Sequence, residues 1–106
     1  MMSSESTYET LLMRVAEKYA HVIDEWKADR VNPFKDGRML GYYEGKSLIL
    51  NELDKGRPLT ELKEQLRTRL QIAKAEWRGD RANRFKDGRL LAWFELSGML
   101  EDALAI

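Results

Sequence analysis

The side chains of this chain with the most capacity for chemistry are acidic and basic residues that occur twice, at a constant offset of 51 residues. Each copy places carboxylates and arginines at matching positions. Carboxylates of this kind, carried on helices, could hold a divalent metal ion while the arginines bind phosphate. The matched pairs are Glu25/Glu76, Asp29/Asp80, Arg30/Arg81, Asp36/Asp87, Arg38/Arg89 and Glu44/Glu95.

An ion-pair network is the simpler interpretation of the same residues. All-α nucleotide pyrophosphohydrolases bind metal through paired Glu-x-x-Glu and Glu-x-x-Asp motifs, whereas here only Glu61 and Glu64 are acidic residues three apart. That pair is not duplicated, and it suits the positive end of a helix dipole. We therefore expect the duplicated residues to lock the two turns through arginine–carboxylate pairs. We expect no catalytic residue, no metal site and no cofactor.

Glu44 and Glu95 are the most informative members of the set, because each lies beside two aromatic residues at the edge of a line of small residues. A half-buried carboxylate needs a partner. Without one its pKa would rise and it would become a plausible site residue. We expect pairing instead, and the nearest arginines are Arg38 and Arg89 or Arg30 and Arg81.

The repeat that contains these residues determines the expected fold. Residues 25–53 and 76–104 align without a gap and are identical at 13 of 29 positions. Two copies of one supersecondary unit therefore make up the chain. We predict helices over 7–30, 33–54, 58–81 and 84–104. They form an all-α four-helix bundle of two αα-hairpins, 7–54 and 58–106, joined by a linker at 55–57 and related by a pseudo-twofold axis, in one domain over 1–106.

Start and stop signals support these bounds. Ser6 and Glu9 have the spacing of a capping box. Asn32 and Asn83 are good N-caps, and Gly56 followed by Pro58 suits the end of one helix and the start of the next. A heptad-like stripe predicts the buried face of the first helix: Tyr8, Leu12, Val15, Tyr19, Val22 and Trp26. We expect Trp26 and Trp77 to be core anchors.

A line of small residues predicts where two helices meet. Gly37, Gly41 and Gly45 recur at every fourth position of the second helix. Glycine inside a helix costs about 1 kcal/mol against alanine, so three in register need compensation. Close approach of another helix is the natural compensation, and we predict that the second and fourth helices cross near Gly37 and Gly88.

The last helix is apolar over a wide arc. One face continues the line of small residues, and the second points well away from it. A helix with so much apolar surface is either central or carries an association patch. We expect association, with homodimer formation through the second face, whose residues are Leu90, Trp93, Phe94, Leu100 and Leu104.

Composition and charge bound the remaining possibilities. There is no cysteine, no apolar run long enough for a membrane span and no signal-peptide pattern, so we expect a soluble cytoplasmic protein. Residues 55–89 hold 11 basic and 5 acidic side chains, while both flanking segments are acidic. We expect the acidic first helix to face the basic third helix, within the fold or across a dimer.

Three functions follow from these observations. The first is a small non-enzymatic helical module, homodimeric, that binds a protein partner. The second is nucleic-acid binding through the third helix and the second turn, with Arg67, Arg69, Lys74, Arg78, Arg81, Arg84 and Lys86 contacting phosphate. The third is a metal-dependent phosphohydrolase that uses Glu25, Asp29, Asp36, Glu44 and their repeats. We favour the first, because no catalytic motif is present.

Overall fold

The computed structural model describes residues 4–104, which form four α-helices and no strand. The bounds are α1 Ser4–Ala28, α2 Pro33–Asp54, α3 Leu59–Gly79 and α4 Arg84–Leu104. The predicted bounds of the second and fourth helices match those observed, while the first and third helices each end two residues earlier than predicted. Across the described residues, no helix is both long enough and apolar enough to cross a membrane.

Local signals account for three of the helix ends. The Asn32 side chain accepts a hydrogen bond from the backbone N–H of Lys35 at 3.2 Å, and Asn83 does the same for Lys86 at 3.1 Å. Gly56, with a φ of 66°, provides the left-handed residue after α2. The predicted capping box is wrong, because Ser6 lies inside α1 and not at its N-cap position.

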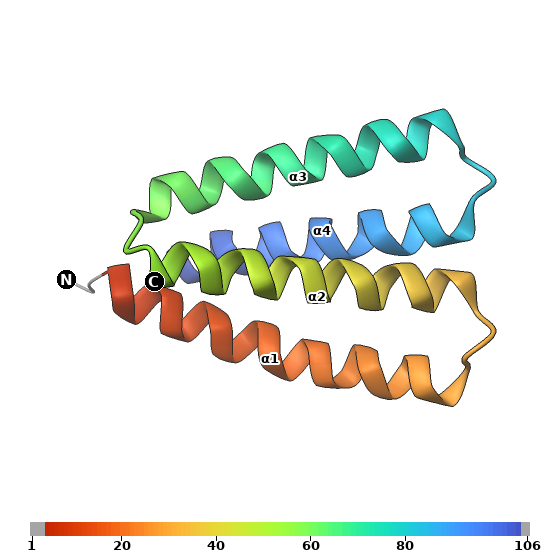
Figure 1. Cartoon of the computed structure of the whole chain (residues 1–106), viewed down its shortest axis with the longest axis horizontal. Coiled ribbons are helices and arrows are strands. Elements are labelled where there is room, and N and C mark those ends of the chain that lie inside the picture. Colours follow the sequence, from red (N-terminus) through yellow and green to blue (C-terminus); the bar gives the residue numbers. More distant parts are fainter. Residues whose placement is uncertain (1–3, 105–106) are drawn as a thin grey trace.

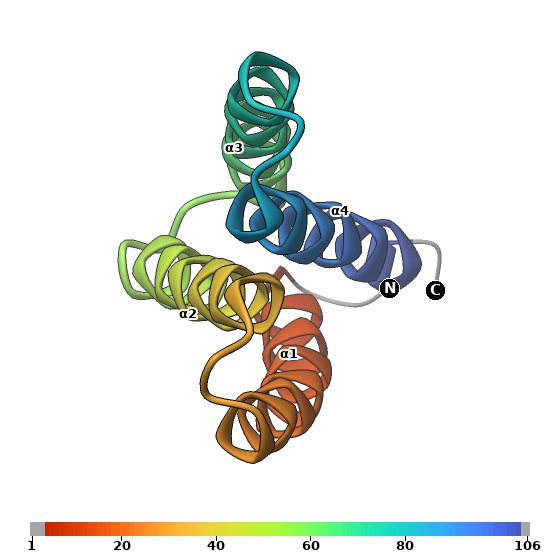
Figure 2. The ribbon, with the colours of Figure 1, turned by 90° about the vertical axis from the view of Figure 1, so that its right-hand side faces the viewer.

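The helices are arranged around a central pair. α2 and α4 run in the same direction and share the most extensive interface of the molecule (Figure 1). α1 packs on α2 and, less extensively, on α4, while α3 packs mainly on α4. α1 and α3 therefore lie on opposite sides of the central pair (Figure 2). The expectation that these two helices face each other within the fold is wrong.

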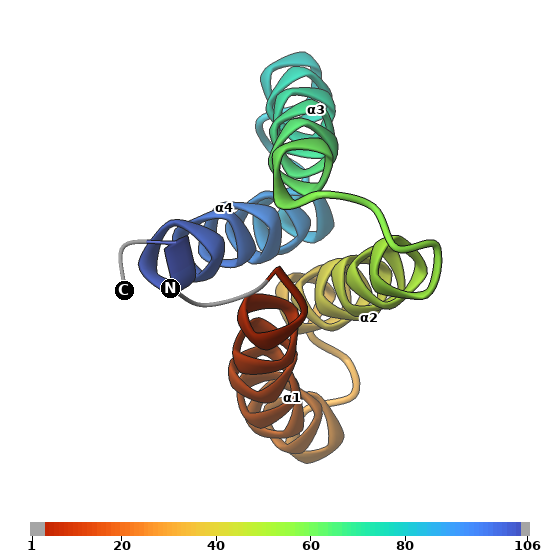
Figure 3. The ribbon, with the colours of Figure 1, turned by 90° about the vertical axis from the view of Figure 1, so that its left-hand side faces the viewer.

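This arrangement brings both copies of the repeated turn to one end of the molecule (Figure 2). The linker lies at the opposite end (Figure 3). There the Tyr8 hydroxyl donates a hydrogen bond of 3.1 Å to the backbone carbonyl of Arg57, and the Arg57 guanidinium lies 3.5 Å from buried Glu52. These contacts fasten the start of the first hairpin to the connection between the two hairpins.

Glycine permits the close approach of α2 and α4. A β-carbon at Gly37 would collide with the backbone carbonyl of Phe85, and one at Gly88 would collide with the carbonyl of Phe34. One turn further along, a β-carbon at Gly41 would come within 2.5 Å of the Ala92 side chain. The predicted crossing at Gly37 and Gly88 is confirmed. These reciprocal contacts fit the pseudo-twofold relation, which stays a prediction.

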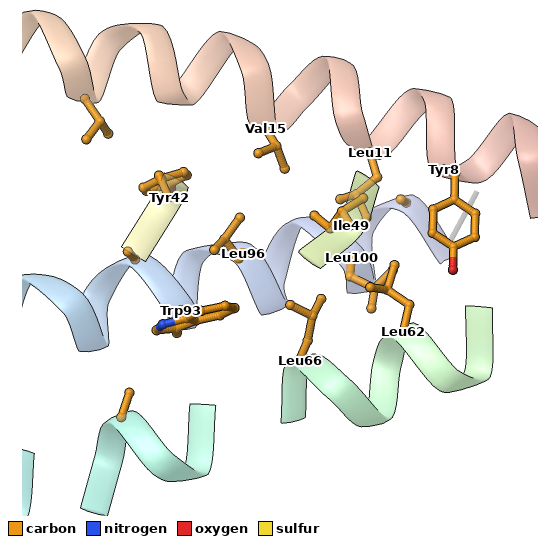
Figure 4. Close-up of a cluster of buried hydrophobic side chains, with 14 residues drawn as sticks. Tyr8, Leu11, Val15, Tyr42, Ile49, Leu62, Leu66, Trp93, Leu96 and Leu100 are labelled. Carbon is orange, nitrogen blue, oxygen red and sulfur yellow. The ribbon is translucent and has the colours of Figure 1, made fainter. Parts of the chain in front are cut away.

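The core lies on both sides of α4 (Figure 4). Trp93 points from α4 toward α3, whereas Val15 and Leu11 approach α4 from α1. Leu11 is fully buried and Leu12 only partly, so the predicted stripe on the first helix is shifted at this position. The reason is that α1 contacts two helices, and its buried face is therefore wider than a narrow heptad seam.

Candidate protein-interaction site

Each repeated turn is closed by one aromatic residue and one carboxylate. The Trp26 indole N–H donates a 2.7 Å hydrogen bond to Asp36 Oδ1, ten residues later. In the second copy, Trp77 donates to Asp87 Oδ1 at 2.9 Å. Each bond ties the end of one helix to the first turn of the next, which fixes the geometry of the hairpin. Both indoles are half-buried.

A pair of arginines links the two hairpins. Arg38 of α2 makes two parallel hydrogen bonds of 3.1 Å to the carboxylate of Glu95 on α4. Arg89 of α4 makes the equivalent bonds of 3.0 Å to Glu44 on α2. Such bidentate pairs are both directional and strong. Glu44 and Glu95 are therefore paired, each with an arginine of the other hairpin.

The third nitrogen of each arginine reaches back to its own hairpin. Arg38 Nη1 contacts Glu25 at 3.1 Å, and Arg89 Nη1 contacts Glu76 at 3.0 Å. Each guanidinium thus joins three helices. Burial lowers the pKa of Arg38, but the hydrogen bonds that Arg38 donates to Glu95 and the negative charge of Glu95 outweigh that effect and raise the pKa overall.

The remaining residues of the turn network also have side-chain partners. Asp29 accepts from the Asn32 side chain at 3.1 Å and lies 3.6 Å from the Lys35 ammonium group. Asp80 has the same two kinds of partner in the second turn. The guanidinium groups of Arg30 and Arg81 lie over the rings of Trp26 and Trp77, at 4.2 and 4.6 Å from the ring centres. The described residues contain no group of three or more histidine, cysteine or acidic side chains placed to hold a metal ion.

The structure divides the predicted association face of α4 into two parts. Trp93 and Leu100 are each only 2% exposed and belong to the core, so they cannot contribute to an association surface. Phe94 and Leu104 are exposed by 62% and 40%, and Leu90 is partly buried. Burial of Trp93 and Leu100 follows from the central position of α4, whose second face is covered by α3.

Phe94 and Leu90 border a hollow between α3 and α4, near the second turn. Its volume is about 280 Å³ and its lining is mainly apolar, formed by Lys74, Trp77, Asp87, Leu90, Leu91 and Phe94. Below, we call this hollow the α3–α4 groove. Its members Trp77, Leu91 and Lys74 were not among the predicted association residues. Leu91 could have been found, because it lies three residues before Phe94 of the predicted face and so on the same side of the helix. Trp77 and Lys74 lie on another helix.

The basic residues of the predicted nucleic-acid surface are also divided. Arg67, Arg84 and Lys86 form ion pairs with Glu64, Asp87 and Asp80. By contrast, no carboxylate among residues 6–104 pairs with the other four, which are Arg69, Lys74, Arg78 and Arg81. Three of these four, Lys74, Arg78 and Arg81, lie on the last turns of α3 or shortly after it. Lys74 lines the α3–α4 groove, and Arg81 lies over the ring of Trp77, which also lines it.

Comparison with known proteins provides no relative from which to transfer a function: the chain matches no protein-family model, no curated protein and no solved structure.

Proposed function

We propose that this protein is a small, non-enzymatic helical module that binds a protein partner in the α3–α4 groove. The observation that supports the proposal most directly is the position of Phe94. This side chain is 62% exposed at the border of an apolar hollow of about 280 Å³. Large exposed aromatic side chains beside a preformed apolar hollow are typical of the centres of protein interfaces.

The arrangement of the turn network also favours binding over catalysis. The duplicated carboxylates contact arginine, lysine, asparagine or tryptophan side chains, and these contacts hold the four helices in place. A rigid scaffold of this kind presents a groove without a large cost in conformational entropy when the partner binds. The proposed partner is a segment of a protein. Formation of a homodimer stays a prediction, and in that case the partner would be a second copy of this chain.

Phe94 and its counterpart in the first copy allow a matched experiment. Tyr43 occupies the equivalent position on α2 and is 57% exposed, but it does not line the α3–α4 groove. Wild-type protein, Phe94→Ser and Tyr43→Ser are immobilised and exposed to extract of the cells that make the protein. A retained protein is purified, and its Kd for the three proteins is measured by calorimetry.

We expect Phe94→Ser to weaken binding by about 2 kcal/mol or more, as for interface anchors in general, and Tyr43→Ser to have little effect. Light scattering after size exclusion shows in parallel whether the partner is a second copy. Equal affinity of all three proteins for the partner would contradict the proposal, because the groove would then not be the binding site.

A further inference from the structure

We infer that the segment bound in the α3–α4 groove is an acidic amphipathic helix. The inference rests on the proposed function and adds the chemistry of the partner. Two features carry it, the apolar lining of the groove and the unpaired cations on its α3 side.

The shape of the groove favours a helix as its occupant. The groove lies between two helices, and residues 4–104 contain no strand whose edge could pair with an extended peptide. Ridges of side chains on a third helix fit the groove between two others. An apolar stripe at positions i, i+3, i+4 and i+7 would place one or two large side chains against Leu91 and Phe94.

Charge on the α3 side of the groove favours an acidic partner. Lys74 lines the groove, and Arg78 follows one helical turn later. Arg81 lies over the ring of Trp77, which also lines the groove. None of these three cations pairs with a carboxylate of the described chain.

Acidic groups already present do not neutralise these cations. Asp87 is the one carboxylate that lines the groove, and both of its oxygens are engaged, Oδ1 by the indole of Trp77 and Oδ2 by Arg84 at 3.6 Å. Carboxylates at the edge of the apolar stripe of a bound helix, on the side toward α3, would complement Lys74 and Arg78.

Nucleic acid is the main rival for these cations. The backbone of a duplex would use Arg78 and Arg81 but would bury neither Leu91 nor Phe94, because its bases are stacked inside. An arginine lies over one face of each of the two indole rings at this end of the molecule, which leaves less of each ring for stacking bases. The observations therefore favour an acidic helix.

Synthetic peptides test the inference directly. Three labelled helical peptides of about 18 residues, or five turns, carry one leucine stripe, with glutamate, glutamine or lysine at the remaining positions. Fluorescence anisotropy gives their Kd values for the full chain at low and high salt. We expect the glutamate peptide to bind at least about tenfold more tightly than the lysine peptide at low salt, with a smaller ratio at high salt.

Variants on the two hairpins locate the binding. Arg78→Glu should raise the Kd of the glutamate peptide by about fivefold or more. Lys27→Glu, at the equivalent position of the first hairpin, should leave this Kd unchanged. Phe94→Ser should weaken the binding of every peptide that binds to the wild type. Circular dichroism on each variant shows that the fold is intact.

The possible outcomes are distinct. If the three peptides bind equally and Phe94→Ser weakens all of them, the acidic preference is wrong and the proposed groove function survives. If the glutamate peptide does not bind, or binds without regard to Phe94→Ser, the inference is wrong. If duplex DNA displaces the glutamate peptide and the binding of the DNA does not depend on Phe94, the cations belong to a nucleic-acid surface instead.

Discussion

Replacing Gly88 by alanine tests the packing on which the whole architecture depends. A β-carbon at this position would lie 2.8 Å from the backbone nitrogen of Arg38 and 2.9 Å from the carbonyl carbon of Phe34. It would approach the oxygen of Phe34 more closely still. Ordinary contacts of this type begin near 3.4 Å. Backbone atoms cannot move aside by changing a rotamer, so α2 and α4 must separate by about an ångström or more.

The size of the effect follows from two opposing terms. Overpacking of a close contact costs 1–3 kcal/mol and occasionally more, and a backbone collision belongs at the upper end of this range. Alanine gains about 1 kcal/mol over glycine in helix propensity. We therefore expect Gly88→Ala to lower the free energy of unfolding by about 2 kcal/mol, which corresponds to a fall in Tm of roughly 10 °C for a domain of this size.

Gly98 provides the matched control on the same helix. A β-carbon there would meet nothing within 4 Å, so Gly98→Ala gains helix propensity without a collision. We expect it to raise the free energy of unfolding by about 0.5–1 kcal/mol. Urea denaturation followed by circular dichroism at 222 nm measures both variants. Should Gly88→Ala prove as stable as Gly98→Ala, the close approach of α2 and α4 would be refuted.

Three further predictions concern single side chains. A double-mutant cycle with Arg38→Met and Glu95→Gln should give a coupling of about 1–2 kcal/mol in urea denaturation, and additive effects would contradict the bidentate pair. Trp93→Ala should cost about 3–5 kcal/mol because its side chain is buried, whereas Phe94→Ala should change the stability by less than about 0.5 kcal/mol; the same denaturation assay compares them. Burial raises the pKa of the Tyr42 phenol far above its ordinary value, with the charge of Glu95 adding to the effect. Below pH 10 both states keep this proton; above it the unfolded state loses it first, so Tm should fall more steeply with rising pH for the wild type than for Tyr42→Phe. Parallel curves for the two proteins would contradict this prediction.

Much of the fold could be predicted from local features of the sequence. Asn32 and Asn83 cap the helices that follow them, and the left-handed residue at Gly56 ends α2, because these effects act within a few residues. The line of glycines in α2 also predicted that another helix packs closely on it. Glycine inside a helix indicates such a contact whichever part of the chain supplies the other helix. The start of α1 was predicted wrongly, because the spacing of Ser6 and Glu9 alone does not distinguish a cap from the interior of a helix.

The candidate site, in contrast, was decided by the tertiary structure. Hydrophobic periodicity shows that a helix such as α4 has two apolar faces, but it does not show which of them another helix will cover. α3 covers Trp93 and leaves Phe94 exposed, although the two residues are adjacent in the sequence. The same holds for charge. In the sequence Lys74 is one of many basic residues, and only the packing of α3 on α4 places its side chain beside an apolar groove. There Lys74 has no carboxylate partner among the described residues. Burial and pairing depend on which helices meet across long stretches of chain, whereas caps and helix ends depend on near neighbours.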